Sequence, residues 1–533
     1  MDVRSKADKT YKARLKLDCI EHLYKRVNDM KDMKEFLQNN EITYEDNPYV
    51  AKNVFIGKKP QEDKIPTYDE VKDQLPQPIF DGHDDYLRCY DYAWRTAFGN
   101  ITSPFVNDKF VSDFIKTAFN GCLFMWDSSF ILMYGKYAKR LFLFQQTLDN
   151  FYALQHKDGY ICREITEEEG LDRFCRHDPS STGPNLMAWC EWSYFENFGD
   201  VERLKKVYAP LRAFHVWFRK NRTWRDGSYF SSGWGCGMDN IPRVQEGYDE
   251  RFSHGYMVWI DTCAQQMMNC DFLIKMNEVL QCDDVSDLVE EREHLYKLIN
   301  ETLWDEKTAF YYDLWRNNEL NMVKHVGSFW TLLAKAVPQE RLERYVAHLT
   351  NPEEFNRTNA VPTLSADHPL YNPHGQYWRG SSWAPTTFMV LTGLTANGCH
   401  DVAYSVGEKF LRNVVTVYNE TGTLWENYAP DFAERGNQSR PNFVGWTGIV
   451  PISIFFEYVI GIQASVSQNR IVWRVNRTER HGILKYPFGT EHTIDLICDA
   501  RDSVSDEPQI TVKSNLPIEV LVIWDGKEKI IRA

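Results

Sequence analysis

Apolar residues recur at helical spacing through most of this chain, with loops rich in Gly, Pro, Asp and Trp between the periodic segments. The pattern predicts helices at residues 86–98, 109–119, 139–155, 185–198, 201–221, 259–280, 285–303, 328–336, 339–349, 382–394, 400–418 and 445–461. About twelve helices with almost no strand between them is the number required for six antiparallel pairs. We therefore expect a mainly α fold, an (α/α)6 toroid barrel.

The two ends of the chain differ from this pattern. Residues 5–37 are charged, with apolar positions such as Leu15, Leu23 and Val27 at helical spacing, and a Pro-rich polar connector follows. This predicts an amphipathic helix and an irregular arm over residues 1–80, ahead of a barrel at 81–463.

After residue 463 the pattern becomes that of strands. Segments 470–475, 492–498, 509–513, 518–524 and 529–532 are rich in β-branched residues and are separated by turn signals such as Asp525-Gly526. We expect a small β domain at 464–533, which could also form part of a sheet packed on the barrel.

Composition narrows the class of ligand. The net charge of −14 and the pI near 5.6 disfavour nucleic acid as a partner, so a neutral ligand fits better. Aromatic residues make up 14% of the chain, including 17 Trp and 28 Tyr, which can exceed what a core needs. Because sugar rings stack on Trp and Tyr, the excess suggests a small carbohydrate.

The chain lacks the signals of export and of metal binding. Its first residues contain no apolar signal-peptide core, and the longest apolar stretch, 446–462, is interrupted by Pro451 and Glu457. Twelve cysteines lie scattered from Cys19 to Cys498 without a CxxC pair. We expect a soluble cytoplasmic protein that has no membrane contact, metal or cofactor; its oligomeric state stays open.

The stretch SSGWGCGMDNIPR, residues 231–243, carries the strongest chemical signal. Its three glycines predict a loop rather than a helix, and Trp234 and Met238 lie close to Asp239 in sequence. Partly apolar surroundings raise a carboxyl pKa and suit the group to donate a proton. Alternatively, Asp239 caps the following turn and Trp234 belongs to the core.

Other loops repeat the combination of a charged residue with Trp. They are FMWDSSF with Trp126 and Asp127, HKDGYICRE with Arg163 and Glu164, YWRGSSWAPT with Trp378, Arg379 and Trp383, LWENYAPD with Trp425 and Glu426, and NFVGWTGIVPI with Trp446. Taken singly, each suits a core, capping or surface ion-pair role. Because alternate loops of a helical barrel converge on one end of its funnel, we expect them to line one sugar site, with Asp239 and Glu426 as the acid pair that glycoside hydrolysis needs.

These motifs resemble the (α/α)6-barrel glycoside hydrolases of families 63 and 37, which include processing α-glucosidases, trehalases and bacterial hydrolases of glucosylglycerate or mannosylglycerate. The similarity spans residues 81–462. It implies that Asp239 is the general acid, that Glu426 is the general base of an inverting reaction, and that the Trp-Asp and Trp-Arg-Gly segments contact the substrate. The chain lacks the Arg-rich trehalase signature before Trp126, and Asn240 replaces an Asp that many family 63 members have.

We therefore predict an inverting hydrolase of α-linked small glycosides, acting on an α-glucoside or α-mannoside of the disaccharide or glycosyl-glycerate type. Asp127 and Arg379 would hold sugar hydroxyls, and Trp126, Trp234 and Trp425 would form apolar walls. Glu164, Asp261 and Glu191 are weaker candidates for the site. An inverting phosphorylase and a non-catalytic sugar-binding protein remain as alternatives.

Overall fold

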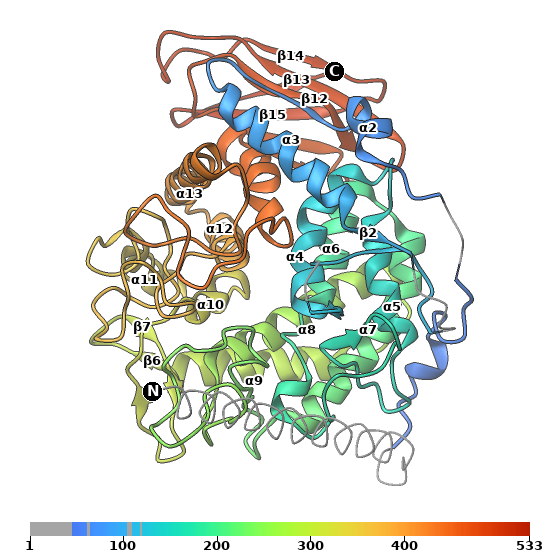
Figure 1. The fold of residues 1–533 in the computed structure, drawn as a ribbon, viewed down its shortest axis with the longest axis vertical. Helices are drawn as coiled ribbons and strands as arrows, with labels where there is room; N and C mark the ends of the chain where they lie inside the picture. The colour runs from blue at the N-terminus through green and yellow to red at the C-terminus, as the bar shows by residue number, and fades with distance from the viewer. Residues whose placement is uncertain (1–44, 61–63, 104–108, 118–119) are drawn as a thin grey trace, which may run out of the picture.

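The computed structural model describes residues 45–60, 64–103, 109–117 and 120–533, so the helix predicted at 5–37 lies outside the described residues. Within them the helices form a closed ring around a central axis (Figure 1). The inner ring is made by α4 (Met125–Gly135), α6 (Met187–Phe198), α8 (Ile260–Leu280), α10 (Trp330–Leu333), α12 (Ala384–Ala396) and the π-helix η9 (Val450–Ile460). Neighbouring inner helices contact each other around the ring, with η8 (Thr447–Ile449) linking α12 to η9, which confirms the (α/α)6 barrel.

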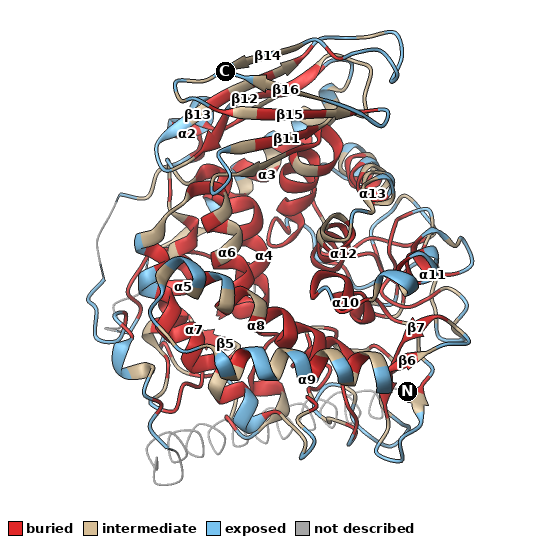
Figure 2. Ribbon diagram, turned by 180° about the vertical axis from the view of Figure 1, so that it is seen from behind, coloured by how far each residue is buried: buried red, intermediate tan, exposed pale blue. Residues whose placement is uncertain are grey.

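An outer ring covers these helices. It consists of α3 (Asp84–Gly99), α5 (Thr147–Ala153), α7 (Val201–Asn221), α9 (Ser286–Thr302), α11 (Gln339–Thr350) and α13 (His400–Thr421). Outer helices bury one stripe, as α9 does with Leu288, Leu295 and Ile299, whereas every residue of α4 is buried. Figure 2 shows this contrast between the exposed outer side of α9 and the buried inner helices.

The C-terminal segment forms two four-stranded sheets at one side of the barrel (Figure 1). One sheet has the order β1 (Gln77–Phe80), β12 (His481–Phe488), β13 (His492–Cys498), β14 (Ile510–Lys513), all antiparallel. The other has the order β10 (Ile462–Ser465), β11 (Arg470–Arg474), β15 (Glu519–Trp524), β16 (Lys527–Arg532), with β11 and β15 parallel. The rings of Trp473 and His481 meet between the two sheets at 5.9 Å.

Strand β1 precedes the barrel in sequence yet pairs with β12, so Phe80 lies opposite His481. Part of the segment expected to be an irregular arm therefore belongs to a sheet of the C-terminal strands. The domain limits at residues 80/81 and 463/464 stay a prediction.

Short elements connect the helices. Among the described residues, two-stranded sheets with two or three residues per strand pair β2 (Ile101–Thr102) with β3 (Phe114–Ile115), β4 (Cys122–Phe124) with β5 (Glu164–Thr166), β6 (Trp304–Asp305) with β7 (Phe310–Tyr311), and β8 (Asp313–Leu314) with β9 (Leu320–Asn321). The helix α2 (Tyr68–Val71) lies before β1.

Three local predictions are wrong. The helix predicted at 109–119 is absent from the described residues of that segment, because side chains of Asn150 and Thr147 satisfy the backbone N–H groups of Val111, Ser112 and Ile115. FMWDSSF is not a loop: Trp126 and Asp127 lie in the first turn of α4. The helix predicted at 139–155 is reduced to α5 and a preceding 3-10 turn.

Candidate active site

The acid loop, residues 231–243, is a series of turns as predicted, and its glycines are required by close packing. Gly237 has φ +75°, and a Cβ there would lie 2.9 Å from the Trp126 ring. At the end of the loop, Arg243 is buried and pairs with Asp261 at 2.6 Å and with Asp313. These contacts fix the loop that carries Asp239, and they make Asp261 a structural partner rather than a site residue.

The loop at residues 424–443 carries Glu426, whose side chain is fully buried. The chain turns back after Glu426, so that the Glu426 N–H donates to the carbonyl of Arg440 at 2.9 Å. The guanidinium Nη1 of Arg440 lies 2.7 Å from Glu426 Oε1, and the Tyr377 hydroxyl donates to the same oxygen at 3.2 Å. Glu426 Oε2 accepts from the Arg440 N–H at 3.3 Å. All three donors favour the ionised carboxylate.

Asp239 and Glu426 line one cavity of about 730 Å³, although they are far apart in sequence. The cavity lies where several inner helices begin, since Asp127 is in the first turn of α4 and Trp446 precedes η9. Of the predicted site residues, those that line it are Trp126, Asp127, Arg163, Trp234, Asp239, Trp378, Glu426 and Trp446, together with the weaker candidate Glu164. Its volume is in the range of ordinary small-molecule sites.

Burial raises the pKa of both carboxyls toward neutral pH. It raises the pKa of Asp239 to about 6, with the positive charge of Arg163 opposing the rise. It raises the pKa of Glu426 to about 7, with Arg440 and the Tyr377 hydrogen bond opposing the rise. Asp239 has no ion pair in the described part of the chain. The two groups can therefore exchange protons near pH 7, and their partners differ: Glu426 has donors that stabilise its charge, and Asp239 has an apolar setting.

Two polar atoms at the wall of the cavity lack a hydrogen-bond partner among the described residues. They are Trp126 Nε1 and Asp127 Oδ1, both buried. Burial, together with the charges of Glu164 and Glu426, raises the pKa of Asp127 well above its usual value. Such groups are costly unless something pairs with them, and hydroxyl groups of a bound sugar would do so.

Aromatic side chains form the mouth of the cavity. The Arg163 guanidinium lies over the rings of Phe174 (4.6 Å) and Trp234 (5.4 Å), pairs with Glu164 at 2.6 Å, and donates to the Trp234 carbonyl at 3.0 Å. Phe252 packs edge-on against Trp234. This side of the cavity offers flat apolar surfaces with one fixed cation between them.

Three predicted contacts do not lie at the cavity. Arg379 pairs with Glu250 at 3.2 Å and donates to the Asn240 carbonyl, so the structure holds it away from the sugar site. Trp383 is fully buried and stacks behind Trp378 at 3.9 Å. Trp425 lies outside, under the guanidinium of Arg435.

Glu191 is also away from the cavity. Within α6 its carboxylate accepts from Arg203 at 2.7 Å and from Tyr152 at 3.0 Å, which is a buried structural network.

Sequence reasoning missed two cavity residues that contact Glu426. Tyr377 begins the YWRGSSW motif, so its position next to Trp378 was a usable signal. Arg440 lies fourteen positions after Glu426, and the two side chains meet because the loop folds on itself. No sequence pattern indicated this contact.

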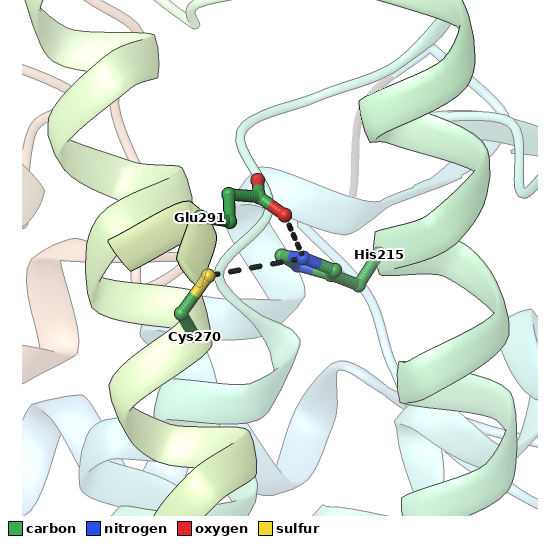
Figure 3. Close-up of side chains that lie close together, drawn as sticks. All are labelled: His215, Cys270 and Glu291. Atoms are coloured by element: carbon green, nitrogen blue, oxygen red, sulfur yellow. Dashed lines mark hydrogen bonds and ion pairs between the residues drawn. The ribbon is translucent and has the colours of Figure 1, made fainter. Parts of the chain in front are cut away.

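One group of side chains away from the cavity has the donor types that zinc prefers. His215 of α7, Cys270 of α8 and Glu291 of α9 lie within 4.8 Å of one another (Figure 3). The Nε2 atom of His215 lies 3.0 Å from Glu291 Oε2 and 3.8 Å from Cys270 Sγ. The carboxylate also accepts from Tyr229.

Hydrogen bonds and burial account for this group without an ion. Asn269 of α8 pairs with the second ring nitrogen of His215 at 2.8 Å. Burial raises the pKa of the Cys270 thiol well above its usual value, which disfavours the thiolate that a metal needs. We interpret the group as a polar junction that ties α7, α8 and α9 together.

Comparison with known proteins shows which proteins this chain resembles. The model of the mannosylglycerate hydrolase MGH1-like glycoside hydrolase domain matches residues 122–446, more than half of the chain. An uncharacterized protein of Borreliella burgdorferi is 24% identical over 388 residues, covering 70% of this chain and 78% of that protein. Alpha-glucosidase 2 of Arabidopsis thaliana is 21% identical over 413 residues, covering 63% of this chain and 52% of that protein.

The chain spans about half the length of the curated glucosidases that it matches. Among solved structures, a family 63 mannosylglycerate hydrolase of Thermus thermophilus in complex with glucose shares the fold, with a TM-score of 0.55 and 21% identity over 67% of this chain and 98% of that one. The match of the family model over the barrel, with both carboxyl loops on one cavity, shows that this chain belongs to the mannosylglycerate hydrolase MGH1-like glycoside hydrolases.

Proposed function

We propose that this family 63 glycoside hydrolase cleaves α-linked small glycosides with inversion of configuration, using Asp239 as general acid and Glu426 as general base. The observation that carries the proposal is the placement of two carboxyls with different partners on one Trp-walled cavity. Glu426 has a cation at 2.7 Å, whereas Asp239 is buried without an ion pair among the described residues. An inverting reaction needs an ionised base and a protonated acid, so the productive form has its proton on Asp239 although the pKa of Glu426 is the higher of the two.

In the proposed reaction, Asp239 donates its proton to the glycosidic oxygen as the bond from that oxygen to the anomeric carbon breaks. A water molecule attacks the anomeric carbon from the opposite face, and Glu426 takes a proton from it. The aglycone leaves with the proton from Asp239, and the sugar leaves with the hydroxyl of the water. Proton exchange with solvent then restores both carboxyls.

The first sugar would lie against Trp126 and Asp127. Their unpartnered buried atoms, Nε1 and Oδ1, supply a donor and an acceptor for sugar hydroxyls. Trp378 and Trp446 offer apolar surface, and the Trp446 indole is fixed by its hydrogen bond to the Glu426 carbonyl at 2.9 Å. An α-glucoside or α-mannoside of the disaccharide or glycosyl-glycerate type fits these features.

Phosphorolysis is the second candidate, and the surroundings of Glu426 disfavour it. A phosphorylase needs a cationic site for phosphate next to the anomeric carbon. Arg440 is the cation nearest to Glu426, and its guanidinium is already bound to that carboxylate. A phosphate placed there would face the negative charge of Glu426, so water is the better acceptor.

The eleven cysteines within the described residues are all free, as in a reducing compartment, which supports a cytoplasmic location. No helix in this part combines the length and hydrophobicity that a membrane crossing requires.

The test is hydrolysis of α-linked disaccharides and glycosyl-glycerates, with the released anomer followed by proton NMR. We expect the β-anomer to form first, without phosphate. Asp239→Asn and Glu426→Gln should each lower kcat by about 10²- to 10⁴-fold with an unchanged circular dichroism spectrum. Asp249→Asn and Glu434→Gln, which change exposed carboxyls on the loops at 245–253 and 424–443, serve as matched controls. Full activity in either catalytic variant would refute the assignment, and dependence on phosphate would favour the phosphorylase.

A further inference from the structure

Asn240 follows the acid Asp239, but its side chain points to a different loop. Its Oδ1 accepts from the backbone N–H of Trp378 at 2.8 Å, and its Nδ2 donates to the carbonyl of Gln376 at 3.1 Å. These two backbone groups lie on either side of Tyr377. One amide side chain therefore satisfies both neighbours of a single residue.

Tyr377 needs such support because its backbone is in a disfavoured conformation. Its φ is +59°, in the left-handed region that a bulky side chain rarely adopts. Only with the backbone in this turn does the sequence bring the Tyr377 hydroxyl to 3.2 Å from Glu426 Oε1 and the neighbouring Trp378 to the cavity wall. A residue kept in such a conformation at a functional site has to be held there by its surroundings.

We propose that Asn240 is a positioning residue: its amide holds the Tyr377 turn and thereby keeps the Tyr377 hydroxyl on Glu426. In this way Asn240, on the loop that carries Asp239, affects the ionisation of Glu426. The inference rests on the proposed function, because it assigns the base role to Glu426.

An amide is required here for a chemical reason. The amide offers both a donor and an acceptor to these two backbone groups, whereas a carboxylate would put a second oxygen against the carbonyl of Gln376. The loop has another attachment that does not use the amide, since Arg379 Nε donates to the Asn240 carbonyl at 3.0 Å and Arg379 also pairs with Glu250. A change of the Asn240 side chain should thus free the Tyr377 turn without unfolding either loop.

Four groups set the proton affinity of Glu426. Arg440 and the Tyr377 hydroxyl stabilise its charge, while Asp239 and Asp127, across the cavity, oppose it. The Asn240 side chain can act on Glu426 only through Tyr377, because it bonds to neither Glu426 nor Arg440 in the described structure. Loss of Asn240 and loss of the Tyr377 hydroxyl should therefore have the same effect, and they should not add.

The experiment compares Asn240→Ala, Asn240→Asp, Tyr377→Phe and the double variant Asn240→Ala/Tyr377→Phe with the unaltered protein. The carboxyl pKa of Glu426 is followed by ¹³C NMR of labelled glutamate and assigned by its loss in Glu426→Gln; kcat/KM is measured in parallel. Each single variant should raise the pKa of Glu426 by about one pH unit and lower kcat/KM about tenfold, and the double variant should match Tyr377→Phe. Asn397→Ala, which removes an amide bridging two backbone carbonyls elsewhere in the barrel, should leave the pKa unchanged.

An unshifted pKa in Asn240→Ala, or shifts that add in the double variant, would overturn the inference. The NMR titration does not need turnover, so the inference and the proposed function can fail separately. A protein that hydrolyses no glycoside refutes the function, while the titration still decides whether Asn240 controls Glu426.

Discussion

The ion pair between Arg440 and Glu426 allows a quantitative prediction for Arg440→Met, which keeps most of the side-chain volume and removes the charge. Arg440 Nη1 lies 2.7 Å from Glu426 Oε1, and the Glu426 side chain is fully buried. A hydrogen bond to a charged group contributes about 1.5 to 3 kcal/mol. The Arg440 side chain is 48% exposed and screened by solvent, so the lower value, about 1.5 kcal/mol, applies.

That free energy corresponds to a rise of about one unit in the pKa of Glu426, from its value of about 7. In the proposed mechanism, the productive protein has Asp239 protonated and Glu426 ionised. Because the pKa of Asp239, about 6, lies below that of Glu426, this form is a minority at every pH. Its share falls about tenfold for each unit by which the pKa of Glu426 rises.

The assay is kcat/KM against pH on the best glycoside of the panel. The unaltered protein should give a bell with limbs near pH 6 and 7: activity falls below pH 6 because Glu426 is protonated, and above pH 7 because Asp239 has lost its proton. Arg440→Met should lower kcat/KM about tenfold below pH 7, move the upper limb about one unit higher, and converge with the unaltered protein above that limb.

Arg435→Met is the matched control, since Arg435 is an exposed arginine on the same loop that lies over Trp425 away from the cavity. If Arg440→Met stays within twofold of the unaltered protein, or if Arg435→Met loses as much, the electrostatic argument for Glu426 is wrong.

Three further predictions concern the surroundings of the pair. Asp127→Ala should lower kcat/KM about 10- to 100-fold in steady-state assays, because a sugar hydroxyl loses its bond to the unpartnered carboxyl; unchanged kinetics would contradict this. Gly237→Ala should weaken inhibition by free monosaccharides, because the added Cβ would displace the Trp126 ring. An unaltered affinity for the monosaccharide inhibitor would contradict this prediction. Arg243→Met should destabilise the protein by about 3 to 5 kcal/mol in urea unfolding, because it leaves the buried carboxylate of Asp261 without an ion-pair partner among the described residues; a loss under 1 kcal/mol would argue against it.

Sequence patterns predicted helices of both rings, such as α7 and α8, but missed α4. The segment around α9 buries a single stripe, so its periodicity is visible in the sequence. Helix α4 is buried on every side and shows no polar face, so FMWDSSF read as a loop. Strand β12 was not among the predicted strands; it contains Gly482, Pro487 and a shift of strand register between Ile483 and Tyr486.

Of the residues predicted for the candidate site, some line the cavity and others do not. Asp239, Glu426 and Trp126 lie in local motifs and were predicted from them, and the cavity brings them together. Arg379 and Trp425 belong to the same motifs but point elsewhere, because side-chain direction depends on how each loop packs.

The residues that escaped prediction are the ones that set the proton affinity of Glu426. A carboxylic acid needs only a local apolar setting to raise its pKa, and a motif such as GMDNIPR provides that within a few positions. To keep a buried carboxylate ionised, a protein must bring donors to it from elsewhere in the fold: Arg440 from the far side of a loop and Tyr377 from another loop altogether. An acid can thus be recognised from sequence, whereas the state of its partner base is a tertiary property, and substitutions at Arg440, Tyr377 and Asn240 should change the reaction with both carboxyls intact.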